Sequence, residues 1–369
     1  MSRKSTERKQ PKARKKARGQ GGRRALQTLV VLGLLGTSAY LTVELRERQQ
    51  DTAPPVESVG AGSGGSSGGK AVPAGERRFE RLANPARTVV RSADGSVLAT
   101  FTDNARTAVL TGPSRTFAEP KFTSAKVVTD SWVRLLPEAW QEGSEKDSWF
   151  KEWFDRSLGA KDPDIFAISM EYLDGAPRKK DARGIFYAGD AQFGPLNPGG
   201  SQAGDMRLEQ SDFYDYLGIP YTFRDGTVER PEPQRLRAMD CSGFVRTVFG
   251  YRARYPLLGK DAKGDGLART SNGMARLSPG VEVLELNGKR PEATDKLQPG
   301  DLVFFDIDKR TGDRLDHVGI YLGLDTDGKP RFISSREEAN GPTFGDKGGT
   351  ARLDGNGFYA TGLRSAKRL

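Results

Sequence analysis

One cysteine, Cys241, and one histidine, His317, occur in the 369 residues of this chain. A thiol becomes a good nucleophile at neutral pH only when a base or a favourable charge activates it. If the chain performs thiol chemistry with an imidazole base, its fold must bring these two distant positions together. The same counts exclude an internal disulfide and leave too few ligands for an ordinary zinc site. The alternative is that Cys241 is a small buried residue and His317 a hydrogen-bonded core residue.

Both residues lie in segments whose patterns predict regular structure. The apolar spacing in residues 240–249 predicts a helix that begins at Cys241, with Asp240 as its N-cap residue. A thiol in this position lies at the positive end of the helix dipole, which favours the thiolate. Residues 317–322 predict a strand that begins at His317. We expect this strand to lie under the cysteine helix, so that the imidazole reaches the thiol.

A third group is needed to orient the imidazole, because a base of this kind usually has a polar partner on its far nitrogen. The next predicted strand, residues 331–335, ends in Ser334 and Ser335, whose side chains point to opposite faces. One of these two hydroxyls can face His317, and the alternation alone does not say which.

The order of the predicted elements indicates the fold class of the C-terminal part. A helix at residues 212–217 precedes the cysteine helix, and buried strands follow at residues 301–305, 317–322 and 331–335. Helices followed by a run of strands indicate an α+β fold. We expect the cysteine helix to pack on an antiparallel β-sheet.

The net charge of +10 belongs to a basic tail. Residues 1–24 contain eleven Lys or Arg and one Glu, which leaves 47 basic and 47 acidic residues in the rest of the chain. A domain that binds nucleic acid normally carries a basic surface of its own. We therefore expect the folded part to bind no nucleic acid.

An uncharged apolar stretch, residues 25–43, follows this tail directly. As a helix it would be roughly 28 Å long, which is close to the thickness of the hydrocarbon core of a bilayer. The preceding positive charge predicts a cytoplasmic N-terminus and an extracytoplasmic remainder. We expect a single-pass signal-anchor in the plasma membrane. The alternatives are a secretory signal cleaved near Thr37-Ser38-Ala39, which would release a secreted protein, a twin-arginine export signal at Arg23-Arg24, and a buried soluble helix.

Two further regions precede the patterned C-terminal part. Residues 44–84 are rich in Gly, Ser and Pro and predict a flexible linker. Residues 85–205 predict a mixed β/α accessory region with a hairpin at Asp94-Gly95 and a segment that contains all four tryptophans. The apolar spacing in residues 128–136 predicts an amphipathic helix, with the tryptophans as core residues. The alternative for the tryptophans is stacking on the sugar rings of a glycan.

Three motifs closely resemble those of the NlpC-type cell-wall peptidases, a compact papain-like group of bacterial cysteine peptidases. In chain order they are Asp240–Val245 (DCSGFV), Pro299–Phe305 (PGDLVFF) and His317–Gly323 (HVGIYLG). Leu217–Tyr221 and Arg269-Thr270-Ser271 are similar to shorter family segments. On this resemblance we assign residues 206–369 to a papain-like cysteine peptidase domain.

The resemblance implies an enzyme that hydrolyses amide bonds in the peptide stems of peptidoglycan, commonly after γ-D-glutamate. The sequence itself gives no case for a metal or an organic cofactor. The resemblance also implies that Cys241 is the nucleophile and His317 the base. Ser334 stands where the family most often has a histidine as the third residue. The substrate-binding residues that the resemblance implies are Asp240, Ser242, Tyr221, Arg269 and Ser271.

We therefore expect a membrane-anchored extracytoplasmic endopeptidase that acts through an acyl-enzyme on Cys241. Two alternatives remain: a non-catalytic wall-binding scaffold with the same fold, and an amide-modifying transferase or deamidase that uses the same dyad. Insertions near residues 221–239 and 324–331 would reshape the rim of the cleft. The sequence identifies no protein partner.

Overall fold

The computed structural model describes residues 77–200 and 205–369, which lie in one compact unit, Val72–Leu369. The basic tail, the apolar stretch of residues 25–43 and most of the predicted linker lie outside the described residues. In the part of the chain that is described, no helix has the length and apolar character needed to cross a membrane. The end of the predicted linker, residues 78–82, forms a strand.

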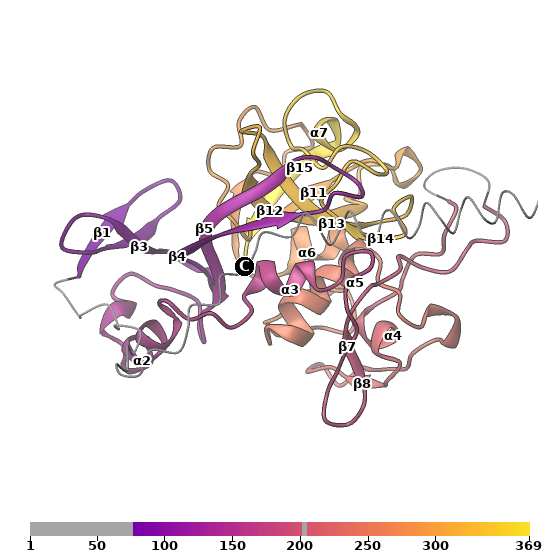
Figure 1. The fold of residues 1–369 in the computed structure, drawn as a ribbon, viewed down its shortest axis with the longest axis horizontal. Coiled ribbons are helices and arrows are strands. Elements are labelled where there is room, and N and C mark those ends of the chain that lie inside the picture. Colours follow the sequence, from indigo (N-terminus) through magenta and orange to yellow (C-terminus); the bar gives the residue numbers. More distant parts are fainter. Residues whose placement is uncertain (1–76, 201–204) are drawn as a thin grey trace, which may run out of the picture. The chain divides into compact units, whose positions relative to one another are not determined.

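A six-stranded antiparallel sheet forms the centre of the C-terminal part (Figure 1). Its β12 strand alternates between two cores: Val318, Ile320 and Leu322 face one, and Tyr321 faces the other. The strands predicted at residues 301–305, 317–322 and 331–335 are confirmed. In spatial order the sheet consists of β10 (Val281–Leu284), β15 (Leu363–Arg368), β11 (Leu302–Phe305), β12 (His317–Leu324), β13 (Pro330–Arg336) and β14 (Gly341–Thr343).

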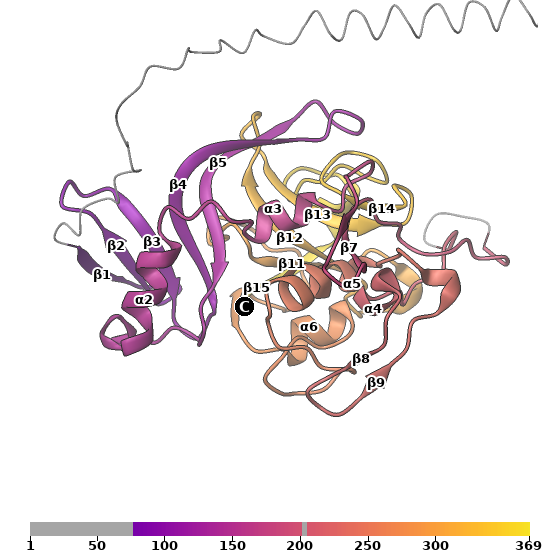
Figure 2. The same cartoon turned by 60° about the horizontal axis from the view of Figure 1, so that its bottom comes forward.

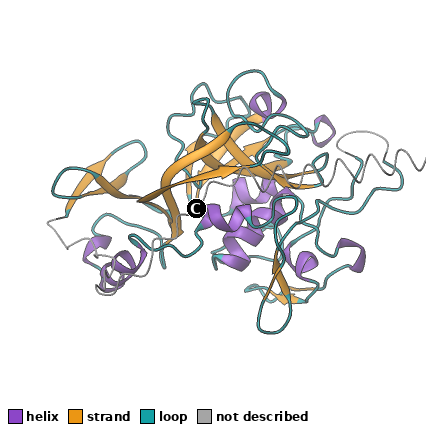
Figure 3. Cartoon of the chain, viewed as in Figure 1, coloured by secondary structure: helices purple, strands orange, loops and turns teal. Residues whose placement is uncertain are grey.

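The cysteine helix α5 (Cys241–Val245) packs on β12 and β13 and continues as a π-helical segment, η3 (Arg246–Arg252). Asp240 caps it, because the Asp240 carboxylate accepts a 2.7 Å hydrogen bond from the N–H of Gly243. Figures 2 and 3 show α5 and α6 (Ser271–Leu277) on the same side of the sheet. The predicted α+β arrangement, a cysteine helix on an antiparallel sheet, is confirmed.

Two short helices complete the surroundings of the site. The helix predicted at residues 212–217 is present as α4 (Phe213–Leu217), with a capping box between Asp212 and Asp215. Helix α7 (Phe358–Gly362) brings Tyr359 to the core on the opposite face of the sheet from α5.

A second antiparallel sheet precedes these elements, and its five strands follow chain order. The hairpin predicted at Asp94-Gly95 is confirmed, since it joins the second and third strands and Gly95 has a φ of +87°. The strands are β1 (Arg78–Leu82), β2 (Arg87–Arg91), β3 (Val97–Thr102), β4 (Thr107–Ala118) and β5 (Lys126–Leu135).

The helix predicted at residues 128–136 is wrong, because β5 covers nearly all of these residues and pairs with β4. Val127 and Val133 are buried whereas Val128 is exposed, which is a strand pattern. The β-branched run from Val127 to Thr129 also favours a strand. The apolar positions matched a helical spacing, but pairing with the neighbouring strand decided the structure.

The interpretation of the tryptophans as core residues is confirmed. Trp140 is fully buried and stacks on Phe101 with ring centroids 4.5 Å apart. Trp153, on α2 (Ser148–Ser157), is also buried, and Trp132 and Trp149 pack partly buried against the same cluster. These side chains are the core of the accessory region.

The accessory strands are fastened to the central sheet. The N–H groups of Arg106 and Thr107 both donate to the carbonyl oxygen of Leu369, at 2.6 Å. Arg368, on β15, forms a buried ion pair with Asp301 and also donates to the hydroxyl of Thr102. The two sheets therefore support one another and hold the strands that carry the site.

Candidate active site

Cys241 lies where the first turn of α5 approaches the start of β12, the strand that begins with His317. The Cys241 thiol lies 3.7 Å from the carbonyl oxygen of Asp316, the residue before the histidine. The N–H of Val318, the residue after it, also contacts the thiol. The two side chains are 8% and 6% exposed. The thiol therefore lies against the main chain on either side of His317, and the two side chains open onto different cavities.

Two anchors fix the backbone on which His317 stands. The Ser271 hydroxyl donates a 2.6 Å hydrogen bond to the carbonyl oxygen of Leu315. The Asp316 carboxylate accepts hydrogen bonds from the N–H groups of Ile307 and Asp308, so it ties the preceding loop to the strand. Ser271 lines the cavity beside Cys241, but its hydroxyl is used to hold this segment.

Cys241 opens onto a cavity of about 570 Å³. Arg269 donates to the Ser242 hydroxyl at 2.7 Å and to the Asp240 carboxylate at 3.2 Å, and Ser242 in turn donates to Asp240. These three residues line the cavity together with Cys241. Four of the predicted site residues therefore lie side by side in one cluster. The cluster presents both a carboxylate and a guanidinium to a ligand.

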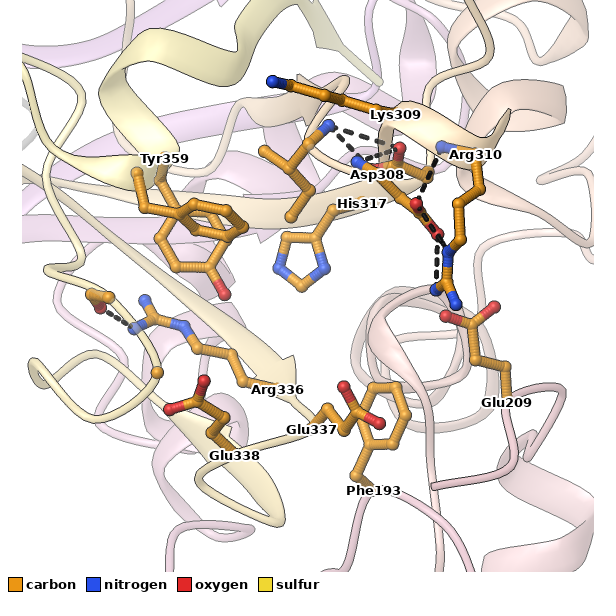
Figure 4. Close-up of a pocket in the computed structure, with 15 residues that line it drawn as sticks. Phe193, Glu209, Asp308, Lys309, Arg310, His317, Arg336, Glu337, Glu338 and Tyr359 are labelled. Carbon is orange, nitrogen blue, oxygen red and sulfur yellow. Dashed lines mark hydrogen bonds and ion pairs between the residues drawn. The ribbon is translucent and has the colours of Figure 1, made fainter. Parts of the chain in front are cut away.

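His317 opens onto a neighbouring cavity of about 690 Å³ (Figure 4). Glu209 and Asp316 line both cavities, so the two hollows flank the Cys–His pair. Figure 4 shows Tyr359 beside His317, with the tyrosine hydroxyl turned toward the imidazole ring. Their ring centroids are 5.2 Å apart.

Neither candidate serine orients His317. The Ser334 hydroxyl accepts a 3.1 Å hydrogen bond from Nε of Arg336, and the Ser335 hydroxyl donates to the carbonyl oxygen of Met239 on the other face of β13. Among the described residues, the buried Nε2 of His317 has no hydrogen-bond partner. The two serines do point to opposite faces, but Ser334 is not the third residue in this geometry, because no hydrogen bond joins its hydroxyl to Nε2 of His317.

Tyr221 does not line either of these cavities. It lines a separate cavity of about 670 Å³, and its ring packs on Phe213 with centroids 4.7 Å apart. The insertion that follows Tyr221 forms a small hairpin, β8 (Tyr221–Thr222) with β9 (Val228–Glu229), which carries the tyrosine with it. Tyr214, on α4, lines the Cys241 cavity in its place.

Residues 218–343 match the model of the NlpC/P60 family. The chain contains an NlpC/P60 domain. The family generally comprises cysteine peptidases and other hydrolases, and it acts on the peptides of peptidoglycan. The matched residues include Cys241, His317 and Ser334 and end before Tyr359. No curated protein matches the chain.

The Cys241 thiol of the NlpC/P60 domain is protonated at rest. Burial raises the pKa of this thiol well above its ordinary value, and the charges of Asp240 and Glu209 raise it further. Burial therefore opposes the effect expected from the helix dipole.

The imidazole of His317 is neutral at pH 7. Burial lowers its pKa to about 3, and the positive charge of Arg336 contributes to this shift. The thiol and the imidazole are thus both neutral at pH 7. In such a pair the imidazole removes the proton while the sulfur attacks, as a general base, and no preformed ion pair is needed.

We expect Cys241 to react slowly with iodoacetamide at pH 7, at least about tenfold slower than a free cysteine, because its thiolate is scarce. The rate should still rise with pH above 9. Since the chain has one cysteine, the measurement needs no variant, and the urea-unfolded chain is the control, with an ordinary thiol pKa. A fast plateau between pH 5 and 7 would instead show a thiolate–imidazolium pair.

Three residues beside the pair were not predicted. Arg336 follows Ser334 by two positions, and the period of a strand could have placed it on the same face. Glu209 precedes α4, and an acidic residue before a helix is common enough that it does not indicate a functional site. Tyr359 lies in an irregular, glycine-rich stretch far from the motifs, so no spacing pointed to it.

Glu209 is exposed and lines both cavities. Surrounding protein atoms that displace water from its carboxyl group raise its pKa to about 7, and the charges of Asp240 and Asp316 add to this. Its charge therefore changes near neutral pH, close to the thiol.

Within residues 77–200 and 205–369, no group of His, Cys, Asp and Glu side chains is arranged to hold a metal ion.

Proposed function

We propose that this protein is an endopeptidase that hydrolyses amide bonds in the stem peptides of peptidoglycan through an acyl-enzyme on Cys241. The observation that carries the proposal is the approach of the thiol to the histidine segment at the boundary of two cavities, within an NlpC/P60 domain. We also propose that residues 25–43 anchor it in the membrane with the domain outside the cytoplasm.

The first step forms a thioester. The sulfur of Cys241 attacks the amide carbonyl carbon while His317 removes the thiol proton. The N–H of Cys241 has no acceptor within its own helix, because the residue opens α5, so it is available to the developing oxyanion. The carbon–nitrogen bond then breaks, and His317 gives its proton to the leaving amine.

The second step releases the acyl group. A water molecule attacks the thioester carbon while His317 removes one of its protons. The carbon–sulfur bond breaks, the peptide leaves with a new carboxyl group, and the proton returns to the sulfur. Because His317 protonates the leaving amine, the leaving part of the substrate belongs on the side of the 690 Å³ cavity. The acyl part belongs beside Asp240 and Arg269.

Digestion of purified peptidoglycan by the full-length protein tests the proposal. Mass spectrometry of the products should find stem peptides cut in two, with one water added across a single amide bond. Release of ammonia from intact stems would identify a deamidase, and a new amide would identify a transferase. Either result would contradict the proposal.

A non-catalytic scaffold is the second candidate, and the buried thiol and the unpartnered Nε2 of His317 favour it. Its signature in the same experiment is binding to sedimented peptidoglycan without any product. Activity that releases cut stem peptides excludes it.

A further inference from the structure

His317 needs an acceptor for the proton on its outer nitrogen. To take the thiol proton, the imidazole nitrogen that faces Cys241 must be bare, so the single proton of the neutral ring must lie on the other nitrogen. Nε2 is buried and unpartnered among the described residues, and both serines of β13 are occupied elsewhere. A buried polar atom without a partner calls for an explanation.

We propose that Tyr359 is the positioning residue of this site and that its hydroxyl oxygen accepts the Nε2–H of His317. This inference rests on the proposed function. The Tyr359 side chain is 3% exposed, its ring centroid lies 5.2 Å from that of His317, and Figure 4 shows its hydroxyl turned toward the imidazole. Hydrogen bonds of this kind are often long in unliganded sites and shorten when substrate binds.

The phenol is suited to this role at neutral pH. Burial raises the pKa of Tyr359, so the hydroxyl keeps its proton. A neutral hydroxyl can accept the imidazole N–H and still donate its own proton to water or to substrate. A tyrosinate, by contrast, would place a negative charge in a buried site.

Arg336 holds Tyr359 in place. Its guanidinium carbon lies 4.5 Å from the centroid of the tyrosine ring, a cation–π contact. The guanidinium is fixed by hydrogen bonds to the carbonyl oxygens of Gly345 and Gly349 and to the hydroxyl of Ser334. Ser334 therefore contributes indirectly: it supports the arginine on which the tyrosine rests.

The rest of the packing also favours a fixed ring. Tyr359 makes edge contacts with Phe305 and Phe332, at centroid distances of 5.5 and 5.2 Å, from two strands of the sheet. A ring held on one face by a cation and on its edges by aromatic side chains has little freedom to turn. Its hydroxyl is thus presented to His317 in one direction, from a segment beyond the family match.

The test compares Tyr359→Phe with Tyr321→Phe. The first variant removes one hydroxyl and keeps the ring, so the packing and the cation–π contact remain. The control removes a hydroxyl from a tyrosine that is buried in the same core cluster but lies further along β12. We expect Tyr359→Phe to lower kcat about 10- to 100-fold with little change in KM. The control should keep the activity of the unchanged protein.

A second readout does not depend on activity. Because the chain has one histidine, nitrogen-15 NMR of the full-length protein, labelled at histidine and purified without a histidine tag, reports the tautomer of His317 directly. We expect one tautomer, with the proton on Nε2, in the unchanged protein and in Tyr321→Phe. Tyr359→Phe should shift both ring nitrogens toward an average of the two tautomers.

The two readouts separate this inference from the proposed function. If the protein cuts no peptidoglycan but Tyr359→Phe still changes the tautomer, the proposed function fails and the role of Tyr359 stands. If Tyr359→Phe leaves both kcat and the imidazole signals unchanged, the role of Tyr359 is refuted even in an active enzyme. Equal losses in Tyr359→Phe and Tyr321→Phe would also overturn it, since they would reflect packing.

Discussion

Replacement of Cys241 by alanine should abolish the release of cut stem peptides from purified peptidoglycan, with a rate loss of at least about 1000-fold. The sulfur forms the bond to the acyl group, and the domain has no other thiol that could replace it. Cys241→Ser should be equally inactive, because burial lowers the pKa of His317 and leaves it too weak a base for a hydroxyl of much higher pKa. Product release is measured by liquid chromatography of the digest.

The fold should survive both substitutions. Among the described residues, the thiol makes polar contacts with only two main-chain groups, the carbonyl oxygen of Asp316 at 3.7 Å and the N–H of Val318, so its loss should cost only about 1 kcal/mol. Thermal unfolding of the variants provides this control. Alkylation of Cys241 in the unchanged protein should cause the same loss of activity. A variant that keeps a tenth of the activity or more would exclude the thiol as nucleophile.

Replacement of Arg246 by methionine should lower the free energy of unfolding by about 3–5 kcal/mol. Arg246 is fully buried, and its guanidinium lies 2.8 Å from the carboxylate of Asp212, which is also fully buried. The same guanidinium donates to three carbonyl oxygens, those of Leu258, Leu267 and Ala268. The variant leaves a buried carboxylate whose remaining cation, Arg269, is 3.4 Å away. Urea unfolding measures the loss.

Two further variants show whether the buried pair is responsible for that loss. Arg246→Met combined with Asp212→Asn removes both charges and should recover part of the lost stability, since no unpaired charge remains. Arg156→Met breaks an exposed pair with Glu152 and should change stability very little. If the double variant is no more stable than Arg246→Met, the cost comes from the lost carbonyl contacts and the ion-pair argument is wrong.

Features with a local cause could be predicted from the sequence. Asp240 before an apolar helical pattern predicted the cap and the start of α5, and Asp94-Gly95 predicted the β2–β3 hairpin. The run that begins at His317 predicted β12, because it combines β-branched residues with a clear alternation. Each of these depends on a few neighbouring residues, so the short-range pattern carried the necessary information.

Features that depend on distant parts of the chain could not be predicted. Val128 and its neighbours became a strand because β4 pairs with them, and Tyr221 was carried away from the thiol by a hairpin that its own insertion forms. The pKa of Cys241 follows from how completely the fold buries it, and the dipole rule does not include burial. Tyr359 reaches His317 only through the packing of α7 on the sheet.

The position of β15 has a consequence for the order of events when this protein is made. Residues 363–368 lie between β10 and β11, whose residues emerge much earlier during synthesis. Until residues 363–368 have been synthesised, β10 and β11 each have an unpaired hydrogen-bonding edge. Such edges can pair with other chains. Because β11 also pairs with the strand of His317, that strand has its full support only after residues 363–368 have been made. We therefore expect the site to form only after residues 363–368 have been synthesised.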